Sequence, residues 1–407
     1  MKAGRFLATG TAVVGALVLS GGALAGCSSS DSGSDSAAGG SSAATKTVEV
    51  EMTSDGCKAT PGTVDAGPVT FEITNTDAAA VTEVELILDN RILAERENIA
   101  PGLASVSFSH KLDGGTYTLY CPGATNEKTT FTVTGKAAEA TGSIADQLKQ
   151  GAADYKTYVI AQVGSLVTAT QALTDAVDRG DLAAAKAAYP KARPFYERIE
   201  PVAGAFCTDG STDCSDKNST SLDFAIDARP AALGPGDKWE GFHVVEKQLF
   251  QANNLDGMKP VADQLLTNVK LLQKVVSEPR FGFAPADIVN GAGDLLDEVS
   301  TTKLTGEEEA YSHIDILDMQ ANVEGSEQAF AMVKPALEQI DPQLTQTITD
   351  AFTKCDKLID SFRDSAQPGG FKLFTQVSAD DKRKMAAAVI AVKDPLATAG
   401  GKVAAAS

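Results

Sequence analysis

Short runs in which apolar and polar residues alternate fill the first third of the chain. They cover residues 48–52, 69–73, 84–88, 106–108, 116–120 and 130–133. Turn-forming pairs such as Pro61-Gly62 and Pro101-Gly102 separate them. A period of two is typical of strands that bury one face, and several short strands at regular spacing favour two packed sheets. We therefore predict a β-sandwich over residues 46–135.

The hydrophobic period changes after residues 136–142, a linker of small residues. Over residues 143–405 apolar positions recur every three or four residues, which is the helical period. Helices are predicted at 144–178, 181–206, 237–252, 259–277, 285–299, 306–340, 342–363 and 379–394. About eight helices of this length fit an all-α domain of two stacked four-helix bundles. The predicted fold class is thus a β-sandwich followed by an all-α domain.

The N-terminus has the pattern of a targeting segment, predicted over residues 1–26. Lys2 and Arg5 precede an apolar run over residues 6–19, which is short for a membrane span. Leu24-Ala25-Gly26-Cys27 matches a bacterial lipobox, so Cys27 is the predicted lipid attachment point. An ordinary secretory peptide or an uncleaved anchor is the alternative. Residues 27–45, rich in Ser, Gly and Ala, are expected to tether a body that works outside the cytoplasmic membrane.

The formal net charge of −19 argues against partners that carry negative charge. Nucleic acids and anionic lipid headgroups would be repelled by such a surface, whereas a cation would be attracted. Acidity that only keeps a secreted protein soluble is the simpler explanation. The net charge therefore argues against nucleic acids and anionic lipids as partners, but it does not identify a ligand.

The chain has six cysteines, of which Cys27 is assigned to lipid. The other five are Cys57, Cys121, Cys207, Cys214 and Cys355. Cys207 and Cys214 flank a polar loop and are candidates for a local disulfide. In an oxidising compartment an odd number leaves one thiol free, paired between molecules or bound to metal.

The sandwich resembles a cupredoxin, because Tyr120-Cys121-Pro122-Gly123 falls where that fold carries its copper cysteine. A blue-copper site needs two histidines, a cysteine and an axial methionine. Only His110 is available, which argues against type 1 copper. Two interpretations of Cys57 and Cys121 remain: a disulfide that closes the sandwich, or a metal site shared with nearby acids. Those acids are Glu83, Glu85, Glu95 and Glu97.

The most informative polar pattern in the second half is His243-Val244-Val245-Glu246. The chain has three histidines, and a spacing of three residues places this imidazole and carboxylate on one helix face as a pair of potential metal ligands. Other polar clusters are Glu197 with Glu200, Asp227, and the segment 311–325. A solvated helix face or a buried polar network is the alternative for each of them.

Taken together and in order, these motifs resemble the EfeO family. The helical motifs are Tyr196 to Pro201, Ile226 to Arg229, Gly241 to Glu246 and Tyr311 to Gly325, and the sandwich motifs are Cys57, Glu83 with Glu85, Glu95 to Gly102, and Tyr120-Cys121. The resemblance covers nearly the whole mature chain. It departs from the family pattern by a loop inserted between Cys207 and Cys214, and by Lys58-Ala59-Thr60 after Cys57.

The resemblance implies a cupredoxin-like domain followed by an imelysin-like domain, in a lipid-anchored iron-binding component of an EfeUOB-type uptake system. Its implied partners are an EfeU-type ferric permease and an EfeB-type haem peroxidase. Carried over by motif, the metal ligands are Glu200, Asp227, His243 and Glu246. The implied second site in the sandwich takes Cys57, Glu83, Glu85, Glu97 and Cys121, with copper as a further candidate cofactor.

The donor set agrees with iron as cargo, in either oxidation state. Three carboxylates and one imidazole suit a hard cation, although zinc also accepts such ligands. Two other functions remain open. A zinc metallopeptidase could use the H-x-x-E pair, and a ferroxidase could use copper bound by Cys57 and Cys121. The sequence favours a binding and transport protein over an enzyme, because the H-E-x-x-H pattern, which supplies its own base, is absent.

Overall fold

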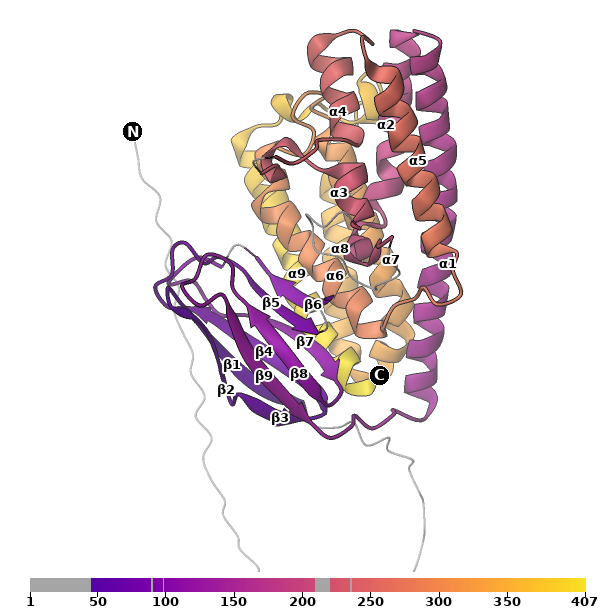
Figure 1. Ribbon diagram of the computed structural model, residues 1–407. Coiled ribbons are helices and arrows are strands. Elements are labelled where there is room, and N and C mark those ends of the chain that lie inside the picture. Colours follow the sequence, from indigo (N-terminus) through magenta and orange to yellow (C-terminus); the bar gives the residue numbers. More distant parts are fainter. Residues whose placement is uncertain (1–44, 89–90, 98, 209–219, 235) are drawn as a thin grey trace, which may run out of the picture. The chain divides into compact units, whose positions relative to one another are not determined.

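The computed structural model describes residues 45–88, 91–97, 99–208, 220–234 and 236–407. Strands lie between residues 46 and 134, and helices lie between residues 143 and 406 (Figure 1). The predicted targeting segment, Cys27 and Cys214 lie outside the described residues. Within the described ranges, no helix is both long enough and apolar enough to cross a membrane.

Residues 46–134 form a sandwich of two sheets, as predicted. The strands are β1 (Lys46–Thr53), β2 (Gly56–Thr60), β3 (Thr63–Asp65), β4 (Gly67–Asn75), β5 (Val84–Leu88), β6 (Arg91–Arg96), β7 (Val106–Leu112), β8 (Gly115–Tyr120) and β9 (Lys128–Thr134). One sheet has the order β2-β1-β4-β7 and the other β3-β9-β8-β5-β6, with β1 parallel to β4 and β3 parallel to β9. Strands β2, β3 and β6 were not predicted, because they are short or do not alternate.

Aromatic rings fill the space between the sheets. The ring centroid of Phe71 lies 5.0 Å from that of Phe108 and 5.2 Å from that of Phe131. All three side chains are buried, as the alternating pattern requires. A disulfide joins Cys57 on β2 to Cys121, the residue after β8. The disulfide interpretation of this pair is confirmed, and the alternative that the two sulfurs are metal ligands is wrong, because neither is available as a thiolate.

The C-terminal half is helical. Its helices are α1 (Ser143–Asp178), α2 (Leu182–Glu197), α3 (Leu222–Asp227), α4 (Phe242–Glu246), α5 (Met258–Val276), α6 (Pro285–Thr301), α7 (Asp315–Ile340), α8 (Pro342–Asp360) and α9 (Ala379–Ala406). Helices α2, α5 and α7 pack against α1, and α6, α7, α8 and α9 form a second group; one continuous apolar core runs through both groups. Two four-helix groups that meet at α7 match the predicted class of fold.

The structure corrects several predicted helix ends. The predicted helix 306–340 begins at Asp315, because His313 has the left-handed φ of 61° and interrupts the turn before it. The predicted helix 181–206 ends at Glu197 and gives way to a 3-10 turn over Glu200–Ala205. Helix α4 begins only at Phe242 and continues as a π-helical turn over Lys247–Ala252. These irregular segments carry the polar residues described next.

Candidate metal centre

A close approach of two backbone segments brings Asp227 and His243 together. Gly241 precedes α4 with a φ of 96°, and a Cβ atom placed there would lie 2.3 Å from the carbonyl oxygen of Ile226. Only glycine tolerates both this conformation and this contact. The C-terminal end of α3, where Asp227 lies, therefore packs directly against the start of α4, where His243 follows.

The carboxylate of Glu246 orients the imidazole of His243. Its Oε2 atom lies 3.1 Å from Nδ1, and its Oε1 atom accepts hydrogen bonds of 2.7 Å from the backbone N–H groups of Tyr311 and Ser312. Burial raises the pKa of Glu246, but the hydrogen bond to His243 and the backbone donors outweigh it and lower the pKa below its usual range. Glu246 is thus a carboxylate, and it fixes the ring by one nitrogen.

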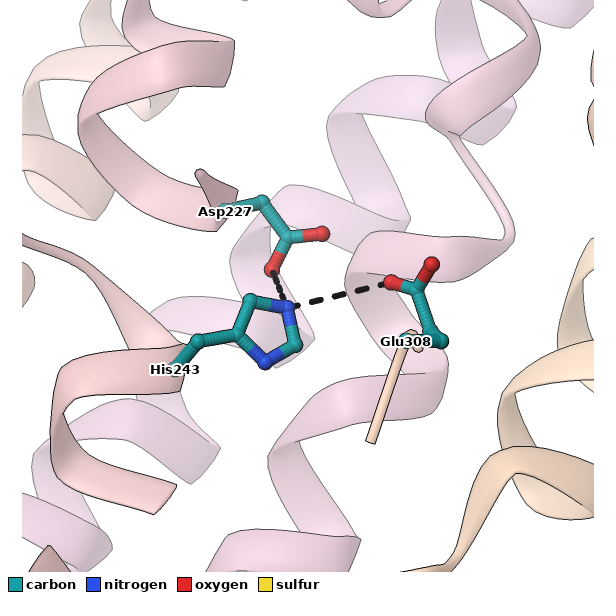
Figure 2. Close-up of side chains that lie close together, drawn as sticks. All are labelled: Asp227, His243 and Glu308. Atoms are coloured by element: carbon teal, nitrogen blue, oxygen red, sulfur yellow. Dashed lines mark ion pairs between the residues drawn. The ribbon is translucent and has the colours of Figure 1, made fainter. Parts of the chain in front are cut away.

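The other ring nitrogen faces two carboxylates. Nε2 of His243 lies 3.5 Å from Oδ1 of Asp227 and 3.8 Å from Oε1 of Glu308 (Figure 2). It is fully buried and has no hydrogen-bond partner within the described part of the chain. One donor atom from each of these three residues lies within 4.8 Å of the other two. A buried nitrogen without a partner costs free energy, which a metal ion at this point would remove.

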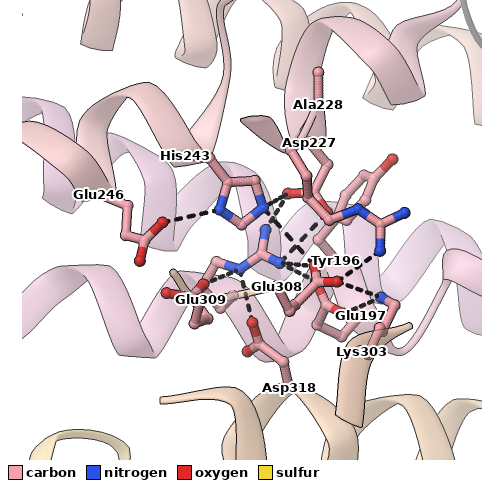
Figure 3. Close-up of polar contacts among 12 residues, drawn as sticks. Tyr196, Glu197, Asp227, Ala228, His243, Glu246, Lys303, Glu308, Glu309 and Asp318 are labelled. Atoms are coloured by element: carbon pink, nitrogen blue, oxygen red, sulfur yellow. Dashed lines mark hydrogen bonds and ion pairs between the residues drawn. The ribbon is translucent and has the colours of Figure 1, made fainter. Parts of the chain in front are cut away.

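Sequence reasoning placed Glu246 and Glu200 among the ligands, and the geometry separates them from this group. Glu246 lies on the side of the His243 ring opposite Asp227 (Figure 3). Glu200 lies next to Lys303, whose Nζ atom is 2.7 Å from both of its carboxylate oxygens. Asn322 also donates to Glu200, at 2.7 Å. Asp227 and His243 come together as expected, while Glu308 takes the place expected for Glu200.

A fully buried arginine lies at the middle of the carboxylates. The guanidinium of Arg193, on α2, pairs with five carboxylates, which belong to Glu197, Asp227, Glu308, Glu309 and Asp318. Its Nη2 atom lies 3.2 Å from Glu308, and its Nε atom lies 3.0 Å from Glu309 and 3.1 Å from Asp318. Figure 3 shows these acidic side chains converging from separate segments of the chain. A buried charge of this kind is tolerated because several partners satisfy it.

Two further cations complete the network. Lys303 pairs with Glu197, Glu200 and Glu308, and Arg229 pairs with Glu298, Glu307 and Glu308. Among the described residues, eight carboxyl groups are therefore paired with only three cationic side chains, Arg193, Lys303 and Arg229. Full ionisation would leave a large negative excess in a buried space, which protons or a metal cation must offset.

The pKa values of these carboxyl groups are shifted in opposite directions, some above and some below the usual range. Burial raises the pKa of Asp227 to about 6, although Arg193 and His243 oppose the shift. Burial also raises the pKa of Asp318 well above its usual range. For Glu308 burial acts in the same direction, but Lys303 and Arg229 outweigh it and hold the pKa below its usual range. The two carboxyl groups beside His243 therefore differ. Glu308 is ionised near pH 6, whereas Asp227 is partly protonated there.

A cavity of about 740 Å³ gives access to this region. Its lining includes Glu200, Asp227, Arg229 and Glu298 from the helical half. Asp227 is 8% exposed, whereas His243 is 0% exposed. Asp227 therefore connects the cavity with the buried imidazole, and a cation that enters reaches a carboxylate first.

The family follows from the comparisons. A family model described as "Imelysin" matches residues 151–399, and a "Cupredoxin-like domain" model matches residues 17–133. Proteins named "Iron uptake system component EfeO" from Escherichia coli O157:H7, Escherichia coli K12 and Shigella flexneri are each 37% identical over 361 residues, covering 87% of this chain and 90% of the relative. The chain belongs to the EfeO family. A solved structure from Parabacteroides distasonis also matches, with 16% identity and a TM-score of 0.47, covering 65% of this chain and 97% of that one.

Membership of the EfeO family confirms the architecture expected from the motifs, a cupredoxin-like domain before an imelysin domain. It supports a role in iron uptake. The family model that matches the helical domain also carries a peptidase label.

The sandwich of this EfeO-family chain has a second carboxylate group. One oxygen from each of Glu83, Glu85 and Glu95 lies within 4.8 Å of the others. Glu95 joins the group instead of Glu97, and the disulfide removes Cys57 and Cys121 from it. Cys207 is disulfide-bonded, while Cys214, its predicted partner, lies outside the described residues; Cys355 is free and buried.

Sequence reasoning missed Glu308 and Arg193. Glu308 is the middle of the run Glu307-Glu308-Glu309, which lies in the predicted helix 306–340 and was not among the candidate ligands. Arg193 stands four residues before Glu197 on α2, a spacing that usually forms a surface ion pair. Neither residue belongs to a recognisable motif. Each lies three residues before one, however: Arg193 before Tyr196 to Pro201, and Glu308 before Tyr311 to Gly325.

Proposed function

We propose that this chain captures iron outside the cytoplasmic membrane and delivers it to a membrane permease. The observation that carries the proposal is the buried Nε2 atom of His243, which has no hydrogen-bond partner among the described residues and faces Asp227 and Glu308. These three residues hold the cation, and Glu246 orients the imidazole from behind. Iron is the cargo of this centre.

The chemistry of the donors supports iron over softer metals. Two carboxylates and one imidazole are hard or intermediate ligands, which suit ferric or ferrous iron and are poor ligands for copper(I). The excess of carboxyl groups around Arg193 supplies the negative charge that a highly charged cation needs when it is buried. Zinc also accepts this donor set, so the metal is assigned from the family role together with the ligands.

The sandwich carries a second, more exposed cation site at Glu83, Glu85 and Glu95. Its ligands are all oxygens, and the bridge between Cys57 and Cys121 argues against copper-assisted oxidation of iron there. We assign residues 46–135 to this first binding domain and residues 143–405 to the domain of the buried centre, joined by a linker at 136–142.

The proposed setting is a lipoprotein of an EfeUOB-type system. Residues 1–26 direct export, Cys27 carries the lipid, and residues 27–45 tether the body. The relatives carry the name of a component of an iron uptake system, which supports partners of the EfeU-type permease and EfeB-type haem peroxidase classes. The tether allows the body to move between capture and docking near the membrane.

Binding fits the centre better than peptide hydrolysis. A zinc peptidase needs an open coordination position, a bound water and a general base beside that water. Glu246 is engaged by His243 and by two backbone N–H groups, on the side of the ring away from Asp227 and Glu308. Arg193 adds a fixed positive charge beside the same ligands, which would oppose activation of a general base.

The test is iron binding by His243→Ala and Asp227→Asn variants of the mature protein. Equilibrium dialysis against ferric citrate should show each variant losing one iron per chain relative to wild type, with at least about 100-fold weaker binding at that site. Glu338→Gln, at an exposed position on α7, is the matched control and should bind as wild type does. Circular dichroism checks the fold. Unchanged iron binding in both folded variants would defeat the assignment.

A further inference from the structure

The guanidinium of Arg193 lies inside a second group of potential ligands. One oxygen from each of Glu197, Glu308 and Asp318 lies within 4.8 Å of the others, and all three side chains are buried. Arg193 pairs with every one of them: with Asp318 through Nε at 3.1 Å, with Glu308 through Nη2 at 3.2 Å, and with Glu197 through Nη2. A single cationic group therefore occupies a set of carboxylates that could otherwise hold a metal ion.

One carboxylate oxygen in this group is left without a partner. Asp318 is 0% exposed, and its Oδ1 atom has no hydrogen-bond partner within the described residues. The guanidinium reaches only the other oxygen, Oδ2, through Nε, because its two Nη atoms face Glu197, Asp227 and Glu308. A buried acceptor left in this way is a ligand position that the arginine does not use.

Glu308 belongs to both groups. It lies near Nε2 of His243 in the first group and contacts Arg193 in the second. A carboxylate shared by two adjacent groups is the usual bridge in centres with two metal ions, which lie about 3.5–4 Å apart. The two groups thus share one carboxylate, as the ligands of a dinuclear centre do, and the guanidinium of Arg193 lies in the second of them.

We propose that Arg193 takes the place of a second metal ion and restricts the centre to one. The inference rests on the proposed function, because the first position is the one assigned to iron. Arg193 remains protonated at all physiological pH values, so its charge is permanent. That charge also contacts two ligands of the first position, Asp227 and Glu308, and weakens their hold on the metal. A single, weakened site suits a protein that must release its cargo.

The test uses Mn²⁺, an oxygen-seeking cation that electron paramagnetic resonance detects directly. In Arg193→Gln the vacated carboxylates should bind one more Mn²⁺ per chain than wild type, and the spectrum should show two exchange-coupled ions. Coupling places the second ion next to the first and separates it from any ion bound in the sandwich. Arg198→Gln, which removes a partly exposed arginine paired with Glu324, is the matched control and should bind as wild type does.

A second variant covers the case in which Arg193→Gln does not fold. Arg193→Gln combined with Glu309→Gln removes one charge of each sign and keeps Glu197, Glu308 and Asp318. The amide oxygen introduced by Glu309→Gln would still accept the hydrogen bond that Tyr189 now donates to the carboxylate. Equal Mn²⁺ stoichiometry in wild type and in the folded variant, or an extra ion without coupling, overturns the inference. His243→Ala alone tests the first position, so failure of the proposed function is distinguished from failure of this inference.

Discussion

The carboxylate of Glu246 lies 3.1 Å from Nδ1 of His243 and therefore acts on the imidazole from the side away from Asp227. The spacing of three residues that suggested two ligands instead pairs the proposed ligand, His243, with the group that orients it. Carboxylates that bind the second nitrogen of a ligating histidine fix its tautomer and raise its basicity. This relationship separates the roles of the two residues.

Glu246→Gln should weaken metal binding at the centre about 10–100-fold, whereas His243→Ala should abolish it. The glutamine keeps an oxygen for His243 but loses the negative charge that favours the required tautomer. Titration calorimetry with Mn²⁺ measures both effects. Equal loss in the two variants would mean that Glu246 is itself a ligand.

Glu308→Gln and Glu200→Gln distinguish the ligand set seen in the structure from the set implied by the motifs. Glu308 faces Nε2 of His243, so its variant should bind Mn²⁺ at least about 100-fold more weakly. Glu200 is engaged by Lys303 and Asn322, and its variant should change the affinity by less than about fivefold. The opposite order of effects would restore Glu200 as the ligand.

Metal affinity should depend on pH through Asp227. Because burial raises its pKa to about 6, protons compete with metal below that value, and Mn²⁺ affinity should fall about tenfold between pH 7 and pH 5.

The stability of the metal-free protein should depend on pH in the opposite direction. Between the unfolded value of about 3.9 and the folded value of about 6 the folded state holds the proton more tightly, so the contribution of Asp227 to the free energy of unfolding decreases as pH rises. Asp227→Asn should flatten both trends, and an unchanged slope in that variant would assign them to another group.

Gly241→Ala should lower the free energy of unfolding by at least about 2 kcal/mol and also weaken metal binding. The added Cβ would strain the backbone at a φ of 96° and push the carbonyl of Ile226 away, moving Asp227 from His243. Gly257→Ala is the control, because its φ of 73° is also left-handed but a Cβ there meets no neighbour within 4 Å. Denaturant unfolding and Mn²⁺ titration measure the two effects. Similar losses of affinity in both variants would mean that the close approach does not position the ligands.

The disulfide between Cys57 and Cys121 should stabilise the sandwich without affecting the helical centre. Replacing both residues by serine should cost about 2–4 kcal/mol. Hydrogen exchange of peptides from residues 46–134 should accelerate, while Mn²⁺ affinity of the buried centre stays constant. A loss of metal affinity at His243 in this variant would show that the two halves are coupled.

Local patterns were sufficient for much of the architecture. Alternation along β1 and β4 and the helical period of α1 and α5 depend only on which face each residue buries, so the sequence predicts them directly. The family motifs also located Asp227 and His243. The beginning of α7 could not be predicted in this way, because residues 306–314 contain side chains that fit a helix but fold around buried charges instead.

The sequence by itself determined the two kinds of domain and the segments that carry Asp227 and His243. Only the tertiary structure decided that Nε2 of His243 faces Asp227, and that Glu308, rather than Glu200, lies beside this nitrogen. It also placed Arg193 among carboxylates that include Asp227, 34 residues away, and Asp318, 125 residues away. Charge pairs between such distant segments leave no periodic trace in the sequence, because they depend on how the helices pack and on how much water the packing excludes.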